Sequence, residues 1–171
     1  PLTGIRNRRG VARFVSAVQG PVAVVILDLD DFKAINDRFG HTVGDEVLRR
    51  VAWAAAAPLL GRGELFRWGG EEFLALIPLD RLRAPEDLPE MCETLRLAVL
   101  NSGASELLRG LRPVTASFGV AVAAREAFET AVEAADKALY EAKRRGKNRV
   151  VRAPAWVPGS GQGAAVALHS A

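Results

Sequence analysis

The 171-residue chain has a single cysteine, Cys92, and no long apolar run. One cysteine excludes an internal disulfide and a cysteine-rich zinc site. The longest apolar stretches, at residues 22–27 and 51–60, are far shorter than the roughly 18–20 residues of a membrane span. The first twenty residues carry four arginines and no apolar block, which argues against a signal peptide. We expect a cytoplasmic location without direct membrane contact from this fragment, although a longer parent protein could be membrane-anchored.

Charge is missing from one end of the chain. Residues 153–171 contain no Lys, Arg, Asp or Glu and are rich in Gly, Ala and Pro, a composition typical of flexible linkers. The whole chain is 49% hydrophobic and 25% charged, which suits a folded domain with a sizeable core. We therefore expect one domain over residues 1–152 and a flexible tail over residues 153–171.

The small net charge of +3 conceals a segregation of signs. Residues 21–80 have a net charge of −4, whereas residues 137–171 have a net charge of +6. Solvated surface charge is the simplest explanation. The alternative is a site that uses acids to bind a metal and bases to bind phosphate. Nucleic-acid binding is disfavoured, because the basic residues lack interleaved aromatics and the central acids would repel a phosphate backbone.

Hydrophobic periodicity predicts both helices and strands. The predicted helices cover residues 6–18, 32–39, 43–60, 85–101 and 126–145. The predicted strands cover residues 22–29, 64–68, 71–77, 113–124 and 148–152. This mixture predicts an α+β domain with helices packed on one sheet.

Two groups of carboxylates stand out because each lies at the end of a predicted strand. Asp28 ends a continuous apolar strand, and Glu71 and Glu72 follow Gly69-Gly70 in a predicted hairpin. A Gly-Gly pair is typical of a tight turn in which both residues have positive φ. If the two strands are neighbours, Asp28 and Glu71 converge, and two carboxylates with substrate phosphates are ligands that Mg²⁺ accepts. A solvated strand end and a plain hairpin are the alternatives.

Five ordered parts of the chain form a set of motifs. They read LTGIRNRR at residues 2–9, DLDDFKAIND and FGHTVGD within 28–45, RWGGEEF at 67–73, SFGVA at 117–121, and ADKALYEAK and GKNR within 135–149. Together they resemble the GGDEF family of diguanylate cyclases, and the signature loop has the variant form GGEEF. The resemblance covers about residues 1–152 and implies a mixed, mostly antiparallel sheet surrounded by helices, as in the palm of polymerases and nucleotidyl cyclases. It also implies condensation of two GTP into cyclic di-GMP and two pyrophosphates.

The resemblance assigns the metal and the proton to a few residues. Asp28, Glu71 and the backbone carbonyl of Leu29 would bind Mg²⁺ or Mn²⁺. The metal would lower the pKa of the attacking 3′-hydroxyl and stabilise charge on the α-phosphate. Either Glu71 or Glu72 would accept the proton, and the sequence does not separate these two roles.

A larger set of residues would bind GTP. It consists of Phe32, Lys33, Asn36, Asp45, Arg67, Gly69, Gly70, Lys143 and Lys147. Asn36 and Asp45 would read the guanine edge, because a carboxylate accepts from both the ring N–H and the exocyclic amine. Asp45 could instead cap a helix that starts near Glu46. Lys143 and Lys147 could simply stabilise a helix C-terminus. Lys147 stands where arginine is usual and would act as a point charge.

The product-inhibition motif of the family, RxxD, is degenerate in this chain. Its window reads Gly61-Arg-Gly-Glu64, so the arginine is absent and a glutamate replaces the aspartate. Arg62 lies one place away from the arginine position. We expect weak or absent feedback inhibition by this route.

The reaction also implies a partner. One domain binds one GTP while the product contains two nucleotides, so a homodimer is required for turnover. An upstream sensor or regulatory domain is expected in the parent protein. The competing hypothesis is a catalytically silent GGDEF module that binds GTP and serves regulation or docking. Retention of Asp28, Gly69, Gly70, Glu71 and Glu72 favours catalysis.

Overall fold

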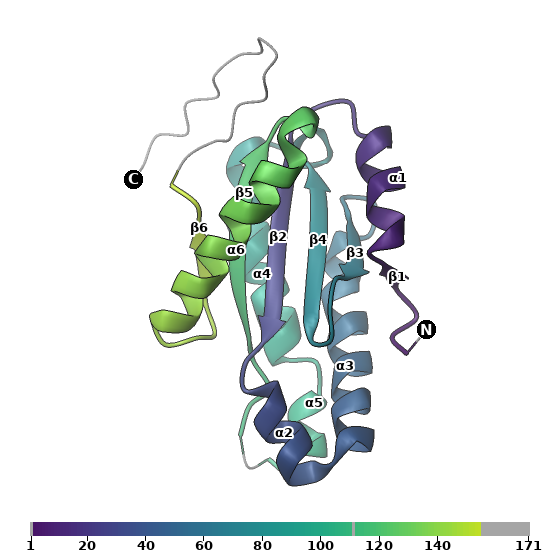
Figure 1. Ribbon diagram of the computed structural model, residues 1–171, viewed down its shortest axis with the longest axis vertical. Helices are drawn as coiled ribbons and strands as arrows, with labels where there is room; N and C mark the ends of the chain where they lie inside the picture. Colours follow the sequence, from purple (N-terminus) through teal and green to yellow (C-terminus); the bar gives the residue numbers. More distant parts are fainter. Residues whose placement is uncertain (1, 111, 155–171) are drawn as a thin grey trace.

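The strand β2 (Val22–Leu29) is buried along its whole length, as its β-branched and aliphatic composition predicts. It lies inside the six-stranded sheet of the computed structural model, which describes residues 2–110 and 112–154 (Figure 1). The strand order is β1-β3-β4-β2-β5-β6. Both neighbours of β2, namely β4 (Glu72–Pro78) and β5 (Ala116–Ala123), are antiparallel to it.

The outer strands complete a mixed sheet. The strand β3 (Glu64–Arg67) is antiparallel to β4. At the two edges, β1 (Arg6–Asn7) is parallel to β3 and β6 (Val150–Arg152) is parallel to β5. The sheet is therefore antiparallel in its centre and parallel at its edges, which confirms the predicted α+β class.

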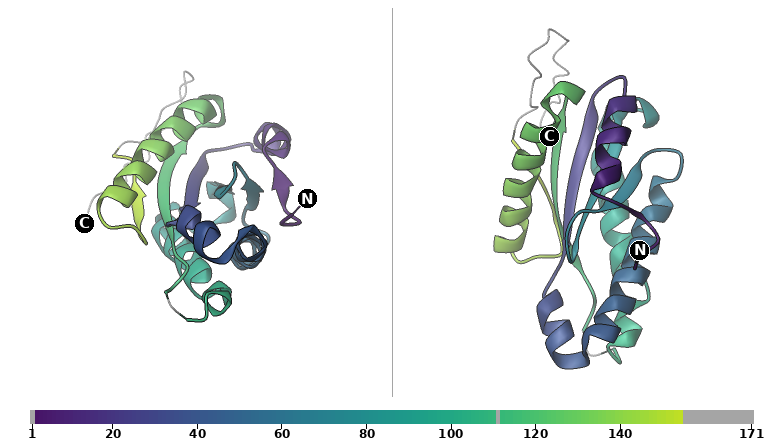
Figure 2. Two further views of the ribbon diagram at one scale, coloured as in Figure 1. Left: turned by 60° about the horizontal axis from the view of Figure 1, so that its bottom comes forward. Right: turned by 45° about the vertical axis from the view of Figure 1, so that its right-hand side comes forward.

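Helices cover both faces of the sheet. Successive side chains of β2 point to opposite sides, and the apolar ones form a core on each face. Val25 and Leu27 face one core, and Val24 and Ile26 face the other. The first core lies under α2 (Phe32–Phe39), α3 (His41–Ala56), α4 (Leu88–Leu100) and α5 (Ala104–Leu107). The second lies under α1 (Arg9–Ala17) and α6 (Phe128–Arg144). Figure 2 shows these layers from two further directions.

Several predicted helix boundaries are wrong. The predicted helix over residues 6–18 is split into β1 and α1. The helix predicted from residue 43 begins at His41, and its last turn is the 3₁₀ segment Ala57–Leu59. The other 3₁₀ segments are Leu79–Arg81, Pro85–Asp87 and Arg125–Ala127. The last two precede α4 and α6, so these α-helices start later than predicted.

Gly119 of β5 packs directly against the backbone of α6. A Cβ atom at this position would overlap the carbonyl oxygen of Ala135 and the backbone nitrogen of Leu139. The absent side chain lets the helix backbone rest directly on the strand. This contact sets the height of α6 above the sheet.

No helix within the described residues is long and apolar enough to cross a membrane. Ala153 donates its backbone N–H to the carbonyl of Val120 at 2.8 Å, just after β6. Most of the predicted tail, residues 155–171, lies outside the described part of the chain.

Candidate active site

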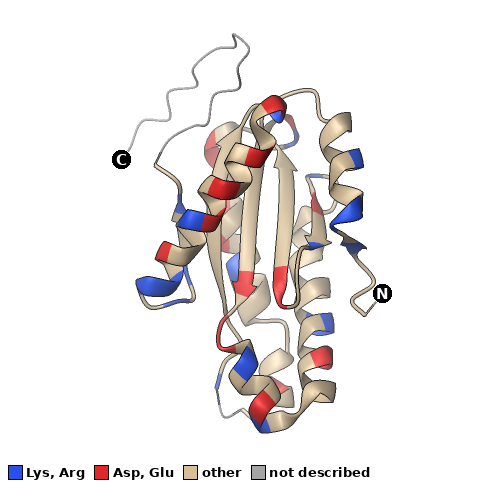
Figure 3. Cartoon of the chain, viewed as in Figure 1, with Lys and Arg blue, Asp and Glu red and all other residues tan. Residues whose placement is uncertain are grey.

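Asp28 and the GGEEF hairpin lie side by side at one end of the sheet. In the antiparallel register of β2 and β4, Asp28 is directly opposite Glu72. The backbone N–H of Leu29 then donates to the carbonyl of Glu71 at 3.4 Å. Figure 3 shows acidic residues at the adjacent ends of β2 and of this hairpin. The neighbouring strands required by the sequence argument are therefore present.

The acidic corner, formed by Asp28, Glu71 and Glu72, is partly buried and crowded with like charge. Asp28 is 8% exposed, and its carboxylate accepts a hydrogen bond from Nζ of Lys143 on α6. Burial raises the pKa of Asp28, Lys143 opposes this shift, and the charge of Glu71 adds to it. Burial also raises the pKa of Glu72, with further contributions from Asp28 and Asp136. Because like charges repel across this corner, a bound divalent cation would relieve the repulsion.

The turn of the GGEEF hairpin differs from the prediction. Neither Gly69 nor Gly70 has a positive φ, so the expected tight turn with two left-handed glycines is wrong. Instead, the carbonyl of Glu72 accepts from the N–H groups of Trp68 and Gly69, at 2.9 and 3.2 Å. A Cβ at residue 69 would lie 2.6 Å from Oε2 of Glu72. The first glycine therefore leaves space for a carboxylate.

Arg67 holds this turn from one side. Its Nη2 donates to the carbonyl of Gly70 at 2.7 Å, and its Nε donates to the carbonyl of Gly69 at 3.3 Å. The guanidinium thus stabilises the loop.

Two of the predicted phosphate-binding lysines lie beside the aspartates at the end of β2. Lys143 contacts Asp28, and Nζ of Lys147 donates to Oδ1 of Asp31 at 2.6 Å. That hydrogen bond lowers the pKa of Asp31 and raises the pKa of Lys147. Lys33 is exposed on the first turn of α2. Two of the three lysines are therefore paired with aspartates next to the candidate site.

The residues predicted to read guanine lie where α2 meets α3. A Cβ at Gly44 would overlap Oδ1 of Asn36 and lie 3.2 Å from Cζ of Phe32. This close packing places Asn36 beside the residue that precedes Asp45. The alternative role of Asp45 as a helix cap is wrong, because α3 begins at His41 and Asp45 lies inside it. Asp45 remains half-buried on the helix.

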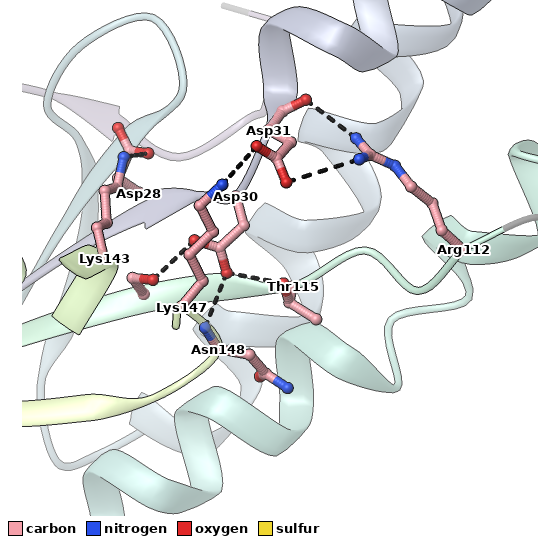
Figure 4. A network of polar contacts seen from close by, with 9 residues as sticks. Asp28, Asp30, Asp31, Arg112, Thr115, Lys143, Lys147 and Asn148 are labelled. Carbon is pink, nitrogen blue, oxygen red and sulfur yellow. Dashed lines mark hydrogen bonds and ion pairs between the residues drawn. The ribbon is translucent and has the colours of Figure 1, made fainter. Parts of the chain in front are cut away.

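Asp30 has a role that sequence reasoning missed. It is 7% exposed and its carboxylate accepts three hydrogen bonds (Figure 4). The donors are Oγ1 of Thr115 at 2.7 Å, Oγ of Ser117 at 2.7 Å, and the backbone N–H of Asn148 at 3.0 Å. The sequence offered one signal, a third acid beside Asp28, but the three partners lie far along the chain.

The degenerate inhibition window lies away from this corner. Arg62 is exposed and, with Arg81 and Arg83, lines a surface cavity of about 380 Å³ next to α4. Glu64 forms an ion pair with Arg6 at 3.1 Å. Glu64 is therefore engaged by the N-terminal segment of the same chain.

The donor set of the acidic corner fits a magnesium or manganese ion that binds together with a nucleotide. Asp28 and Glu71 supply anionic oxygens, and Mg²⁺ is typically held by one or two carboxylates plus phosphates and water. Among the residues that the structure describes, no group of three or more His, Cys, Asp or Glu forms a complete metal site. The remaining ligands would come from nucleotide oxygens, water and the carbonyl of Leu29.

The fold and this corner together define an α+β domain with a candidate metal–phosphate site at one end of its sheet. The family model "Diguanylate cyclase, GGDEF domain" matches residues 1–149. The chain belongs to this family.

Known proteins support this placement. The chain is 36% identical to diguanylate cyclase DgcM of Escherichia coli, over 89% of this chain and 37% of that protein. It is also 36% identical to response regulator PleD of Caulobacter vibrioides, over 88% of this chain and 35% of that protein. The chain thus spans about a third of the length of these relatives.

Solved structures show the same fold. Diguanylate cyclase SiaD of Pseudomonas aeruginosa, in complex with its activator SiaC, matches with a TM-score of 0.73 and 34% identity, over 90% of this chain and 60% of that chain. The GGDEF domain of DgcB from Caulobacter crescentus, in complex with c-di-GMP, matches with a TM-score of 0.70 and 31% identity, over 91% and 95% of the two chains.

Proposed function

We propose that this domain is a diguanylate cyclase, which condenses two GTP into cyclic di-GMP and two pyrophosphates. The observation that carries the proposal is the register of β2 and β4, which brings Asp28 next to Glu71 and Glu72. Lys143 contacts Asp28 at the same place. The similarity to named diguanylate cyclases and to a GGDEF domain in complex with c-di-GMP supports it.

The acidic corner would hold the reactive metal. Asp28, Glu71 and the carbonyl of Leu29 are the proposed ligands. A bound Mg²⁺ or Mn²⁺ acidifies a hydroxyl and stabilises charge on a phosphate. Glu72 lies opposite Asp28, and burial raises its pKa, so it favours holding a proton more than an ordinary glutamate does. This makes Glu72 a candidate acceptor of the 3′-hydroxyl proton alongside Glu71.

The cationic groups would bind the triphosphate. Lys143 and Lys147 already lie beside the corner, but each is held by an aspartate. Neutralisation of Asp28 by a divalent cation would weaken the hold on Lys143, which then becomes available to a phosphate oxygen. Lys33 and Arg67 complete the proposed set, and Gly69 and Gly70 let the loop backbone approach the phosphates.

Guanine would bind where α2 meets α3. Asn36 and Asp45 supply the polar edge there, and Phe32 lines the same junction. A carboxylate at position 45 selects guanine, because adenine does not offer adjacent ring N–H and amine donors.

Turnover would require two copies of the domain. The 3′-hydroxyl of each GTP must reach the α-phosphate of the other, so two sites must face each other. An upstream sensor or regulatory domain of a longer protein would bring them together. The SiaD structure contains an activator protein, which shows that one relative is controlled by a partner.

The decisive experiment is product analysis. Concentrated protein is incubated with GTP and Mg²⁺, and the nucleotides are separated by chromatography, with and without a dimerising coiled coil fused at the N-terminus. We expect cyclic di-GMP, and none from Glu71→Ala. GTP retention without turnover in the forced dimer would instead support the silent module.

Feedback control is expected to be weak. The window at Gly61, Arg62 and Glu64 departs from the family motif, and Glu64 is engaged by Arg6. Isothermal titration with cyclic di-GMP is therefore expected to show no tight site there. Tight binding that is lost in Arg62→Ala would contradict this.

A further inference from the structure

The turn between α6 and β6, residues 145–149, carries Lys147 in a strained conformation. Lys147 and Asn148 both have left-handed backbone angles, with φ of 63° and 44°. Residues other than glycine rarely adopt such angles, and each costs of order 1 kcal/mol or more. A turn of this kind persists only where surrounding contacts determine it.

Two contacts from elsewhere in the fold fix this turn at Asn148. The backbone N–H of Asn148 donates to Oδ2 of buried Asp30 at 3.0 Å. Its side-chain oxygen accepts from Nη1 of Arg96 on α4 at 2.7 Å, and Arg96 is itself held by Glu93. Figure 4 shows Asp30 and Asn148 next to Lys147.

The carboxylate of Asp30 also joins the turn to the acidic corner. Its other hydrogen bonds come from Thr115, just before β5, and from Ser117, which is opposite Asp28 in the sheet register. One buried side chain therefore connects the start of β5, next to Asp28, with the turn that carries Lys147. Its neighbour Asp31 meets this turn through the side chain of Lys147, at 2.6 Å, and its carboxylate also forms an ion pair with Arg112 at 3.7 Å.

We infer that Asp30 is a positioning residue for the triphosphate: it holds the backbone of the turn so that Lys147 stands beside the metal carboxylates. This inference rests on the proposed GTP site. A positioning role differs from a purely structural one, because the effect of Asp30 on nucleotide binding then depends on the presence of Lys147.

A double-mutant cycle tests this. The probe is a GTP analogue with a methylene between the α- and β-phosphates, which cannot release pyrophosphate, titrated with Mg²⁺ into wild type, Asp30→Asn, Lys147→Met and the double variant. Loss of a charged phosphate contact is expected to weaken binding about tenfold in Lys147→Met and about fivefold in Asp30→Asn. In the Lys147→Met background, Asp30→Asn is expected to add little.

A matched control separates positioning from stability. Thr115→Val removes another hydrogen bond from the same carboxylate oxygen but leaves Asn148 bound to Asp30. It is expected to lower the unfolding temperature while binding of the analogue stays within about twofold. Amide hydrogen exchange of Asn148 is expected to accelerate in Asp30→Asn and to stay slow in Thr115→Val.

The outcomes are distinguishable. Additive effects of Asp30→Asn and Lys147→Met, or equal weakening by Thr115→Val, would overturn the positioning role while leaving the GTP site intact. Failure of the wild type to bind the analogue would overturn the proposed function and this inference with it.

Discussion

Asp28 and Asp30 are two residues apart and equally buried, but their surroundings differ. Asp28 faces Glu71 and Glu72, and burial, with the charge of Glu71, raises its pKa although its partner Lys143 opposes the shift. Asp30 accepts hydrogen bonds from two hydroxyls and one backbone N–H, all neutral donors whose positions are set by the fold. The lysine partner of Asp28 could be exchanged for a cation, whereas the carboxylate of Asp30 is committed to its three donors. The donors around a buried acid therefore separate a candidate metal ligand from a positioning group.

The largest expected effect is on catalysis at the acidic corner. Glu71→Ala is expected to reduce cyclic di-GMP formation by about a hundredfold or more, since several kcal/mol of metal-mediated charge stabilisation are lost. Chromatographic product analysis measures this, with exposed Asp80→Ala as the matched control. Retained activity in Glu71→Ala would remove the acidic corner from the mechanism.

The next effect concerns stability and is expected to separate the two aspartates. Asp30→Ala leaves three buried donors without their acceptor and is expected to cost about 3 kcal/mol of unfolding free energy. Asp28→Asn removes a charge that burial already disfavours and leaves Lys143, whose side chain is 36% exposed, able to turn to water. Its cost is therefore expected to stay below about 1 kcal/mol. Urea denaturation at neutral pH measures both. Equal losses would mean that both aspartates are structural.

A smaller effect is expected in the pH dependence of stability. Because the pKa values of Asp28 and Glu72 are raised in the folded protein, the folded state binds more protons than the unfolded state just above the ordinary carboxyl range. Their contribution to stability therefore falls as pH rises through that window. Other groups, such as Asp31, have lowered pKa values and act in the opposite direction.

A comparison of the stability of metal-free wild type with that of Asp28→Asn/Glu72→Gln isolates the contribution of these two carboxyl groups to the pH dependence. The double variant is expected to lose less stability than wild type as pH rises from the ordinary carboxyl range towards neutrality. Parallel stability curves from thermal unfolding would show that the corner is not destabilised by its own charge.

The smallest effect is expected at the turn that Asp30 holds. Lys147→Arg replaces a point charge with a planar fork that can contact a phosphate through two hydrogen bonds. We expect binding of the GTP analogue to tighten by about two- to fivefold. Weaker binding would indicate that the ion pair with Asp31 needs lysine geometry.

The central strands and the acidic corner were predictable because their signals are local. An apolar run that ends in Asp28 and a second that starts after Glu72 are visible in the sequence, and antiparallel register brings the acids together. The first strand was not predictable, since Arg6 and Asn7 are too few to show a period and depend on pairing with β3.

The roles of Asp30 and Gly69 were also beyond sequence patterns. Asp30 receives its donors from residues 115, 117 and 148, which only the folded chain brings together. Gly69 matches the composition of a tight turn, but its requirement comes from the Glu72 carboxylate and not from its own φ. Tertiary contacts determined both cases.

The close contact at Gly119 has a consequence for motion. With the backbone of α6 resting on Gly119, a slide of the helix along the strand would press its main chain against the Cβ atoms of the neighbouring β5 residues. In the proposed exchange of Asp28 for a phosphate oxygen, Lys143 would therefore move by rotation of its own side-chain bonds, a picosecond-to-nanosecond event, and not by a helix shift on the microsecond-to-millisecond scale. That exchange would be fast compared with any rearrangement of the domain.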